Sequence, residues 1–447
     1  MTTARTATPS TARAINDRLA LDLLLERGPL TASDLRTLTG LSRPTVADLL
    51  ERLQRSGLVA HAGESAALRR GPNARLYGLV ADRAHLAGID IRSSGVSLVV
   101  ADLTGRTLGT ATIAAFASAP GREGASGAAA AEGTGAAERA GGGADAGPAS
   151  GTVNGAIDGD LLVERTVETL LATAAEVGAR ELHTVAVGAP GLVDPATGML
   201  NNSGKLPEWH TKLLTALRSR PGMEVILENE VNLAGIAEHR LGAARGRRDF
   251  ALIWLGYGVG ASVVLDDRLR RGASGGTGEI GFLPVPGTVG LPESTKCDAG
   301  FHSMVSSAAI CALAARHGLT AEPGEGEDVA AEDEAGVRVE DREPAAAAVV
   351  RQAVEDGADG FLDELAQRIA VGASAICVVL DPGCLVLGGE IGQAGGPELA
   401  GRVEHHLTRL SPLATEVRAG TAGGGAVLAG AVLIAGDAVR RELFGGD

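Results

Sequence analysis

The segment EVILENEVNLAGIAEHRLG, at positions 224–242, restricts the fold more than any other stretch of this chain. Its apolar run predicts a buried strand, and Glu228, Asn229 and Glu230 end that strand where a helical pattern begins. A strand that passes directly into a helix is typical of α/β folds. Because such folds place their chemistry at the carboxyl ends of strands, Glu230 is either a general base or a residue that has lost this role.

The length of 447 residues is too great for one simple core and predicts two or three domains. Two segments interrupt the patterned sequence: an Ala/Gly-rich tract at about 117–157 and an acidic tract at about 320–345. The first has few large apolar groups to offset the entropy of ordering, so we expect a disordered insert there, and we expect the second to be a low-complexity insert.

The N-terminal 80 residues predict a helix-turn-helix. Ile15, Leu19, Leu23 and Leu24 have helical spacing, which predicts a first helix that Gly28-Pro29 ends. Two more helices follow around a tight turn at Gly40. We expect Thr31 or Ser33 to cap the second helix, with Leu35 and Leu38 facing inward, and Ser42 to cap the third, with Pro44 in its first turn and an apolar stripe of Val46, Leu49, Leu50 and Leu53.

A wing and a basic charge point to DNA as the partner of this head. Two short strands around a loop follow the third helix, and positions 1–80 hold 11 Arg against 7 Asp or Glu, whereas the rest of the chain carries a net charge of −19. Ser42, Arg43 and Thr45 lie at the exposed start of the third helix, where bases and phosphates are contacted. In the wing, the arginines suited to phosphate or minor-groove contact are Arg69, Arg70 and Arg75. The alternative is a small helical interaction domain with solvated arginines.

No apolar run approaches the roughly 20 residues of a membrane span, and the polar start does not resemble a secretory signal. Cys297, Cys311, Cys377 and Cys384 form no CxxC pair, so the sequence supports neither a zinc site nor a disulfide framework. We therefore expect a cytoplasmic protein without contact to a membrane.

Four stretches carry a resemblance to a known family: GAPGLVD (188–194), ENEVN (228–232), GGTGEIGFLPV (275–285) and LDPGCLVLGGEIG (380–392). Together with the head, they make the chain resemble a ROK-family transcriptional regulator. The resemblance implies an α/β fold with an N-terminal winged helix-turn-helix at 1–82. It also implies a two-lobed, actin-like ROK domain of the hexokinase type at 83–447, with a ligand cleft between the lobes.

The motifs that ROK kinases use for catalysis are altered in this chain. The first phosphate loop resembles D-x-G-G-T in the kinases, but here it reads Asp90 to Ser94 without either glycine, and β-carbons obstruct the approach of phosphate to the backbone. The second loop contains Tyr257 where the kinases have a threonine. Glu230 replaces the aspartate base, and a misplacement of ~1 Å can cost on the order of 100-fold in rate. Phe282 replaces a zinc-binding histidine, and only Cys297 remains of the cysteine cluster.

We therefore expect Glu230 to be the relic of a base in a cleft that still binds a ligand. Expected ligand contacts are Asn201, Asn202, Asn229, Glu230 and Glu279. The alternatives are that Glu228 and Glu230 only cap the following helix, and that Glu279 is a solvated loop acid.

These patterns favour a transcriptional regulator, acting as a repressor, that senses a sugar or sugar derivative and needs neither cofactor nor metal. Expected partners are a double-stranded DNA operator, a small sugar-like effector and a second copy of the chain in a homodimer or homotetramer. The rival hypothesis is an ATP-dependent sugar kinase with an added DNA-binding head. A third hypothesis is a regulator that has lost its ligand and responds to a protein partner.

Overall fold

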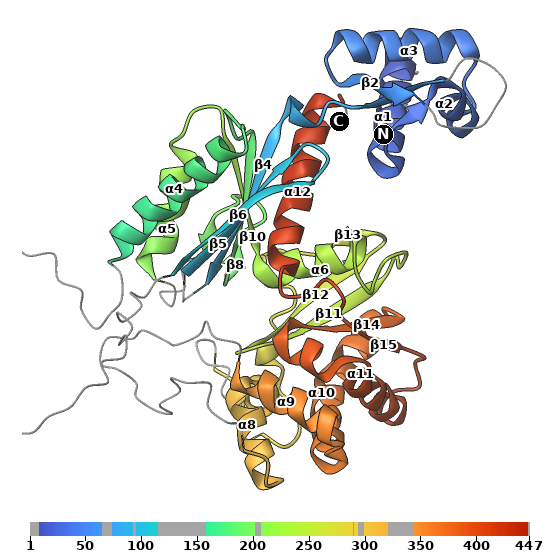
Figure 1. Cartoon of the computed structure of the whole chain (residues 1–447). Coiled ribbons are helices and arrows are strands. Elements are labelled where there is room, and N and C mark those ends of the chain that lie inside the picture. The colour runs from blue at the N-terminus through green and yellow to red at the C-terminus, as the bar shows by residue number, and fades with distance from the viewer. Residues whose placement is uncertain are drawn as a thin grey trace, which may run out of the picture.

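The computed structural model describes residues 9–64, 74–92, 95–114, 158–201, 207–288, 290–293, 299–320 and 344–445. It shows a head followed by two α/β lobes (Figure 1). The two predicted inserts fall almost wholly outside the described residues, so their expected disorder stays a prediction; helix α9 already begins at Ala345. No described helix is long and apolar enough to cross a membrane.

The head is a winged helix-turn-helix, as the sequence predicts. A three-stranded sheet in the order β1-β3-β2 packs beside a bundle of helices. Its elements are α1 (Pro9–Arg27), β1 (Leu30–Thr31), α2 (Ala32–Thr39), α3 (Arg43–Arg55), β2 (Val59–Glu64) and β3 (Arg75–Leu79). The antiparallel pair of β2 and β3 forms the wing.

Local capping explains why the helices of the head begin and end where they do. The Thr31 hydroxyl accepts a hydrogen bond from the Asp34 N–H at 3.1 Å, and the Asp34 carboxylate accepts one from the Thr31 N–H at 3.0 Å. This capping box satisfies two donors at the start of α2. Ser42 accepts from the Thr45 N–H at the start of α3. Gly40 ends α2 with φ of 70°, a left-handed conformation that favours glycine.

The expected apolar faces of the head are only partly correct. Leu35 and the predicted stripe of α3 are buried. Leu38, however, is 37% exposed, so its inward placement was wrong. Ile15 and Leu19 lie in the predicted first helix but are 59% and 41% exposed. The described residues from Thr11 to Ile15 are all exposed, because the first half of α1 extends beyond the core.

The first lobe is built on a five-stranded sheet in the order β10-β7-β4-β5-β6, in which β10, β7 and β4 are parallel. Helices α4 and α5 cover one face, whereas α6 and α12 lie on the other. The bounds are β4 (His85–Arg92), β5 (Gly95–Asp102), β6 (Thr107–Ala114), α4 (Gly159–Glu176), β7 (Thr184–Ala189), α5 (Glu208–Arg218), β10 (Glu224–Asn229), α6 (Glu230–Arg240) and α12 (Ala426–Leu443). Burial on both faces explains the nearly continuous apolar runs of β4 and β7.

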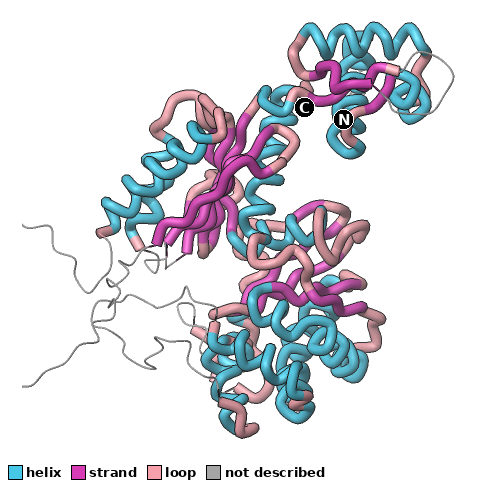
Figure 2. The backbone as a smooth tube through the Cα atoms, viewed as in Figure 1, coloured by secondary structure: helices cyan, strands magenta, loops and turns pink. Residues whose placement is uncertain are grey.

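The second lobe repeats this plan with the strand order β13-β12-β11-β14-β15. Helices α8 to α11 share one core with it, whereas α6 packs on its other face. The bounds are β11 (Phe250–Leu255), β12 (Val259–Leu265), β13 (Arg268–Leu269), α7 (His302–Val305), α8 (Ser307–Arg316), α9 (Ala345–Asp356), α10 (Asp359–Leu380), β14 (Cys384–Gly388), α11 (Gly389–Leu410) and β15 (Glu416–Ala419). Figure 2 shows the two sheets as separate groups of strands.

Helices α6 and α12 join the two lobes. Helix α6 leads from β10 of the first lobe to β11 of the second, and α12 returns from β15 to the sheet of the first lobe. Buried Glu238 ties them together, because its carboxylate accepts hydrogen bonds from the N–H groups of Ala243 and Ala422. At the far end of α12, Phe444 belongs to the same buried cluster as Leu58 and Val59 of the head.

Candidate DNA-binding face and interlobe site

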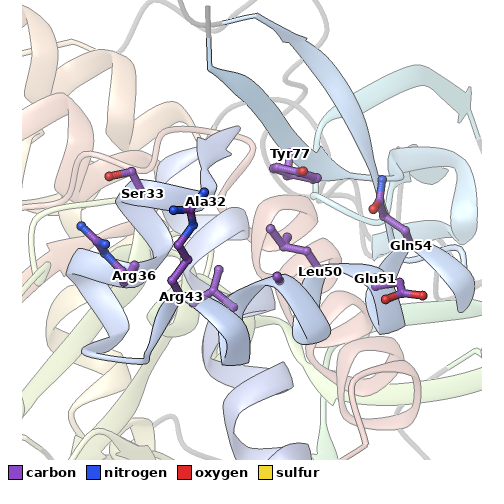
Figure 3. Close-up of a pocket in the computed structure, with 10 residues that line it drawn as sticks. Ala32, Ser33, Arg36, Arg43, Leu50, Glu51, Gln54 and Tyr77 are labelled. Atoms are coloured by element: carbon purple, nitrogen blue, oxygen red, sulfur yellow. The ribbon is translucent and has the colours of Figure 1, made fainter.

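The exposed side of α3 borders an open hollow of about 460 Å³ in the head (Figure 3). Leu50 and Val46 contribute apolar lining, and Arg36 of α2 lies near Arg43 of α3. Tyr77 of β3 lies on the side of the wing. A recognition helix bordered by two arginines and a wing strand can place polar side chains against DNA.

The structure describes four of the six predicted DNA-binding residues. Arg43 is exposed at the first position of α3. Ser42 and Thr45 instead bond to each other through their hydroxyls at 2.8 Å, which fixes the start of the helix. Arg75 is exposed at the beginning of β3. Arg69 and Arg70 lie outside the described residues.

Four polar or aromatic residues of the hollow were missed by the sequence analysis: Arg36, Glu51, Gln54 and Tyr77. Counting along α3 from Arg43 at helical spacing reaches Ala47, Glu51 and Gln54, so periodicity alone could have found two of them. Arg36 and Tyr77 come from other elements, and only the tertiary structure brings them to this face.

The interlobe site is the group formed by Asp90, Arg92, Asn229, Glu230, Glu279 and Glu390. The carboxyl ends of β4 and β10 supply the first four residues, and the start of α11 supplies Glu390 from the other lobe. Glu279 follows Gly278 in a loop whose backbone is bonded to Ala261 of β12.

Asn229 is the cap of α6 and also the partner of Glu230. Its side-chain oxygen accepts from the N–H groups of Val231 and Asn232 at 2.9 and 3.2 Å. Its amide nitrogen donates to Gly191 O at 3.1 Å and to the Glu230 carboxylate at 3.0 Å. The alternative in which Glu228 and Glu230 are the caps is therefore incorrect, because the cap hydrogen bonds end on Asn229.

Glu230 sits among other acidic groups. The pKa of Glu230 is raised to about 8, chiefly because its carboxyl is removed from water, and Asp90 and Glu279 raise it further while Arg92 opposes them. Burial likewise raises the pKa of Asp90, against the effect of Arg92. Glu230 is thus largely a neutral carboxylic acid at pH 7, which can donate as well as accept a hydrogen bond.

Glu228 has a separate, structural role. Its buried carboxylate accepts from Arg271 at 2.6 Å and from the Asn232 amide at 2.9 Å. These bonds tie the end of β10 to the segment after β13, so the pair positions the neighbouring Asn229 and Glu230.

Arg92 connects the two lobes. Its Nε donates to Asp90 Oδ2 at 2.9 Å, and its Nη1 lies 3.7 Å from Glu390 Oε1. Glu390 also lies over the second glycine turn, since a β-carbon on Gly256 would be 2.9 Å from its Oε2. Ser93 and Ser94 lie outside the described residues.

The structure describes less of the remaining predicted residues, Asn201, Asn202 and Cys297. Asn201 ends β9 (Leu200–Asn201), which pairs with β8 (Leu192–Val193) directly after Gly191, but its side chain is not described. Asn202 and Cys297 lie outside the described residues. Within the described part of the chain no group of three His, Cys, Asp or Glu side chains is suited to hold a metal ion. The expected lack of zinc stays a prediction.

Known proteins resemble both parts of the chain. Residues 160–438 match the model of the ROK family, and residues 15–70 match that of the MarR family. A glucokinase of Halalkalibacterium halodurans is 29% identical over 220 residues, which are 48% of this chain and 63% of that protein. The DNA-binding transcriptional dual regulator NagC of Escherichia coli is 30% identical over 138 residues, 31% of this chain and 33% of NagC.

A solved structure shares the whole architecture. It is described as a ROK family transcriptional regulator, homologous to the E. coli MLC protein, and it matches with a TM-score of 0.63 at 19% identity over 97% of this chain and 98% of that one. This likeness supports the fold of a winged-helix head on a two-lobed body. Since the ROK model covers more than half of its residues, the chain belongs to the ROK family.

Proposed function

We propose that this protein is a DNA-binding transcriptional regulator, acting as a repressor, whose interlobe site senses a sugar or sugar derivative. The observation that carries the proposal is the union of a capped recognition helix with a ROK body in one chain. The head is assigned to residues 1–82 and the body to 83–447. A regulator among its relatives, NagC, supports the same assignment.

The sensing role rests on the polar groups of the interlobe site. Asn229 and Glu230 present an amide and a carboxylic acid that suit sugar hydroxyls, and Glu279 adds an acceptor. Asn229 and Glu230 lie at the end of a strand of the first lobe, and Glu279 lies in a loop of the second. A ligand that contacts all three therefore shifts the equilibrium between different arrangements of the lobes. Such a ligand controls DNA binding only if its affinity differs between those arrangements.

A titration of DNA with and without sugars tests this function. The full-length protein is mixed with genomic fragments, and bound inverted repeats are identified and confirmed by gel shift. We expect binding to weaken as salt rises and to change in the presence of one sugar of a panel. A protein that binds no DNA at low salt would remove the regulator proposal. Mass measurement of the complex tests the proposed homodimer or homotetramer.

A sugar kinase is the second candidate. Its support is that Glu230 has a pKa of about 8, near the pH at which a general base works, and that a glucokinase is among the relatives. Against it, Glu390 lies beside the second glycine turn, and Arg92 pairs with Glu390. Sugar-dependent release of ADP from ATP would support the kinase, and we expect none above background.

The third candidate is a regulator that responds to a protein partner in place of a sugar. Thermal-shift measurements with the sugar panel separate it from the first proposal. Stabilisation by a sugar, lost in the Glu230→Gln variant at alkaline pH, supports sensing in the interlobe site.

A further inference from the structure

Arg92 has its charge neutralised from two sides. Asp90, in the same strand, is 3% exposed and bonds to the guanidinium at 2.9 Å. Glu390 approaches from the other lobe at 3.7 Å, from the first turn of α11. A guanidinium held by two carboxylates is poorly available to an incoming anion, because that anion must displace one of them.

The other charges of the interlobe site are acidic. Asp90, Glu279 and Glu390 carry carboxyl groups, and Glu230 is close enough to the first two for their charges to raise its pKa. With Glu230 protonated, this group holds three other carboxyl groups and one guanidinium, that of Arg92. A phosphate that enters here meets repulsion, since like charges in a partly desolvated site repel more strongly than in water.

The backbone around Gly389 and Gly256 also argues against phosphate binding in the interlobe site. Gly389 has φ of 76°, and a β-carbon there would lie 2.3 Å from Leu255 O, so the turn after β14 packs directly on the end of β11. Glu390, the next residue, lies beside Gly256, because a β-carbon at Gly256 would be 2.9 Å from Glu390 Oε2. A carboxylate therefore sits on the glycine turn itself.

We propose that Arg92 is a built-in counter-ion that bridges the lobes through Asp90 and Glu390, so that the interlobe site selects sugars without a phosphate group and excludes polyphosphates. The sugar part of this inference rests on the proposed function. The exclusion of anions rests only on the charges and contacts of the site.

Pyrophosphate binding tests the counter-ion without knowledge of the effector. Calorimetry and thermal shift compare the wild type with Glu390→Gln, which removes one of the two carboxylates that neutralise Arg92. We expect pyrophosphate to bind Glu390→Gln at least about tenfold more tightly than the wild type, as the loss of one like charge implies. Arg92→Met in the Glu390→Gln background should abolish the gain. Arg106→Met is the matched control, because Arg106 pairs with Asp102 within one lobe.

Two results would overturn the inference at this stage. One is pyrophosphate binding to the wild type as tight as to Glu390→Gln. The other is a gain in Glu390→Gln that persists when Arg92 is also replaced, since the anion would then bind elsewhere.

Paired sugars test the selectivity itself. Glucose, N-acetylglucosamine and their 6-phosphates are titrated into the wild type and Glu390→Gln. We expect the unphosphorylated sugar of a pair to bind more tightly by about tenfold or more in the wild type, and the ratio to shrink in Glu390→Gln. A sugar phosphate that binds the wild type as tightly as its parent sugar contradicts the proposal. If none of the four compounds binds, the proposal that the site senses these sugars fails, while the pyrophosphate experiment still decides the role of Arg92.

Discussion

The amide of Asn229 donates a hydrogen bond to the carboxyl of Glu230 at 3.0 Å, while its oxygen caps the helix that Glu230 begins. One side chain thus fixes both the start of α6 and the orientation of the group at the centre of the interlobe site. The carboxyl that it orients is protonated at neutral pH, because the pKa of Glu230 is about 8.

Replacement of Glu230 by Gln should remove a pH dependence of stability. The folded pKa lies above the unfolded value of about 4.5, so the folded state retains a proton that the unfolded state loses. Stability should therefore fall as pH rises from about 4.5 to 8, by up to about 1.4 kcal/mol per unit. Urea denaturation at a series of pH values should show this slope in the wild type and a flatter profile in Glu230→Gln.

The same substitution should affect sugar affinity mainly in alkaline solution. At pH 7 the amide imitates the protonated acid, so affinity should change little. Above pH 8 the wild type gains a charged acceptor, which is worth about 1.5–3 kcal/mol, and the variant should then bind one to two decades more weakly. Calorimetry at pH 7 and pH 9 makes the comparison. An equal loss at both values would show that Glu230 is already ionised at pH 7.

His210 should make the protein sensitive to mild acid. It is 1% exposed in α5, neither ring nitrogen has a hydrogen-bond partner in the described structure, and burial lowers its pKa to about 4. Because the unfolded state binds the proton first, stability should be lost as pH falls from about 6.5 to 4, by up to about 1.4 kcal/mol per unit. His210→Leu should flatten this part of the profile, whereas His405→Gln, at an exposed position, should not.

Arg43→Ala should weaken specific DNA binding by roughly 1–3 kcal/mol if Arg43 contacts a base. The exposed Arg248 of the body is the control, and its replacement by Ala should leave DNA affinity unchanged. Gel shifts at several salt concentrations separate the roles: loss of a phosphate contact should lower the salt dependence, whereas loss of a base contact should lower specificity. Affinity and specificity equal to those of the wild type would remove Arg43 from the reading face.

Purified protein should contain no zinc in stoichiometric amount. The resemblance to the ROK kinases implies that Phe282 replaces a zinc-binding histidine and that Cys297 is the single cysteine in the stretch expected to hold the cysteine cluster. One cysteine cannot close a tetrahedral site. Metal analysis after extensive dialysis gives the answer, and about one zinc per chain would contradict this prediction.

Short-range patterns predicted much of this molecule. Thr31, Ser42 and Gly40 marked the limits of the helices because caps and turns depend on neighbouring residues. The strand-to-helix passage at Asn229 was predicted for the same reason, and the structure rejects the alternative in which Glu228 and Glu230 cap the helix, since Asn229 is the cap.

Long-range pairings were beyond the sequence. Nothing near Arg92 predicts Glu390 as its partner, because the contact depends on how two lobes meet. The raised pKa of Glu230 likewise depends on Asp90 and Glu279, which come from distant segments. The inward placement of Leu38 also failed, since periodicity identifies an apolar side of a helix but not whether another element covers it.

Helix α12 is long enough to transmit a movement between the lobes to the head. Its 18 residues span roughly 27 Å, from the loop bonded to Glu238 to Phe444 beneath the head. A rigid rod of that length converts a tilt of about 10° at one end into a displacement of roughly 5 Å at the other. In the proposed homodimer the two recognition helices would enter half-sites about 34 Å apart, so we expect a small rotation between the lobes to change the spacing of the two heads relative to the DNA.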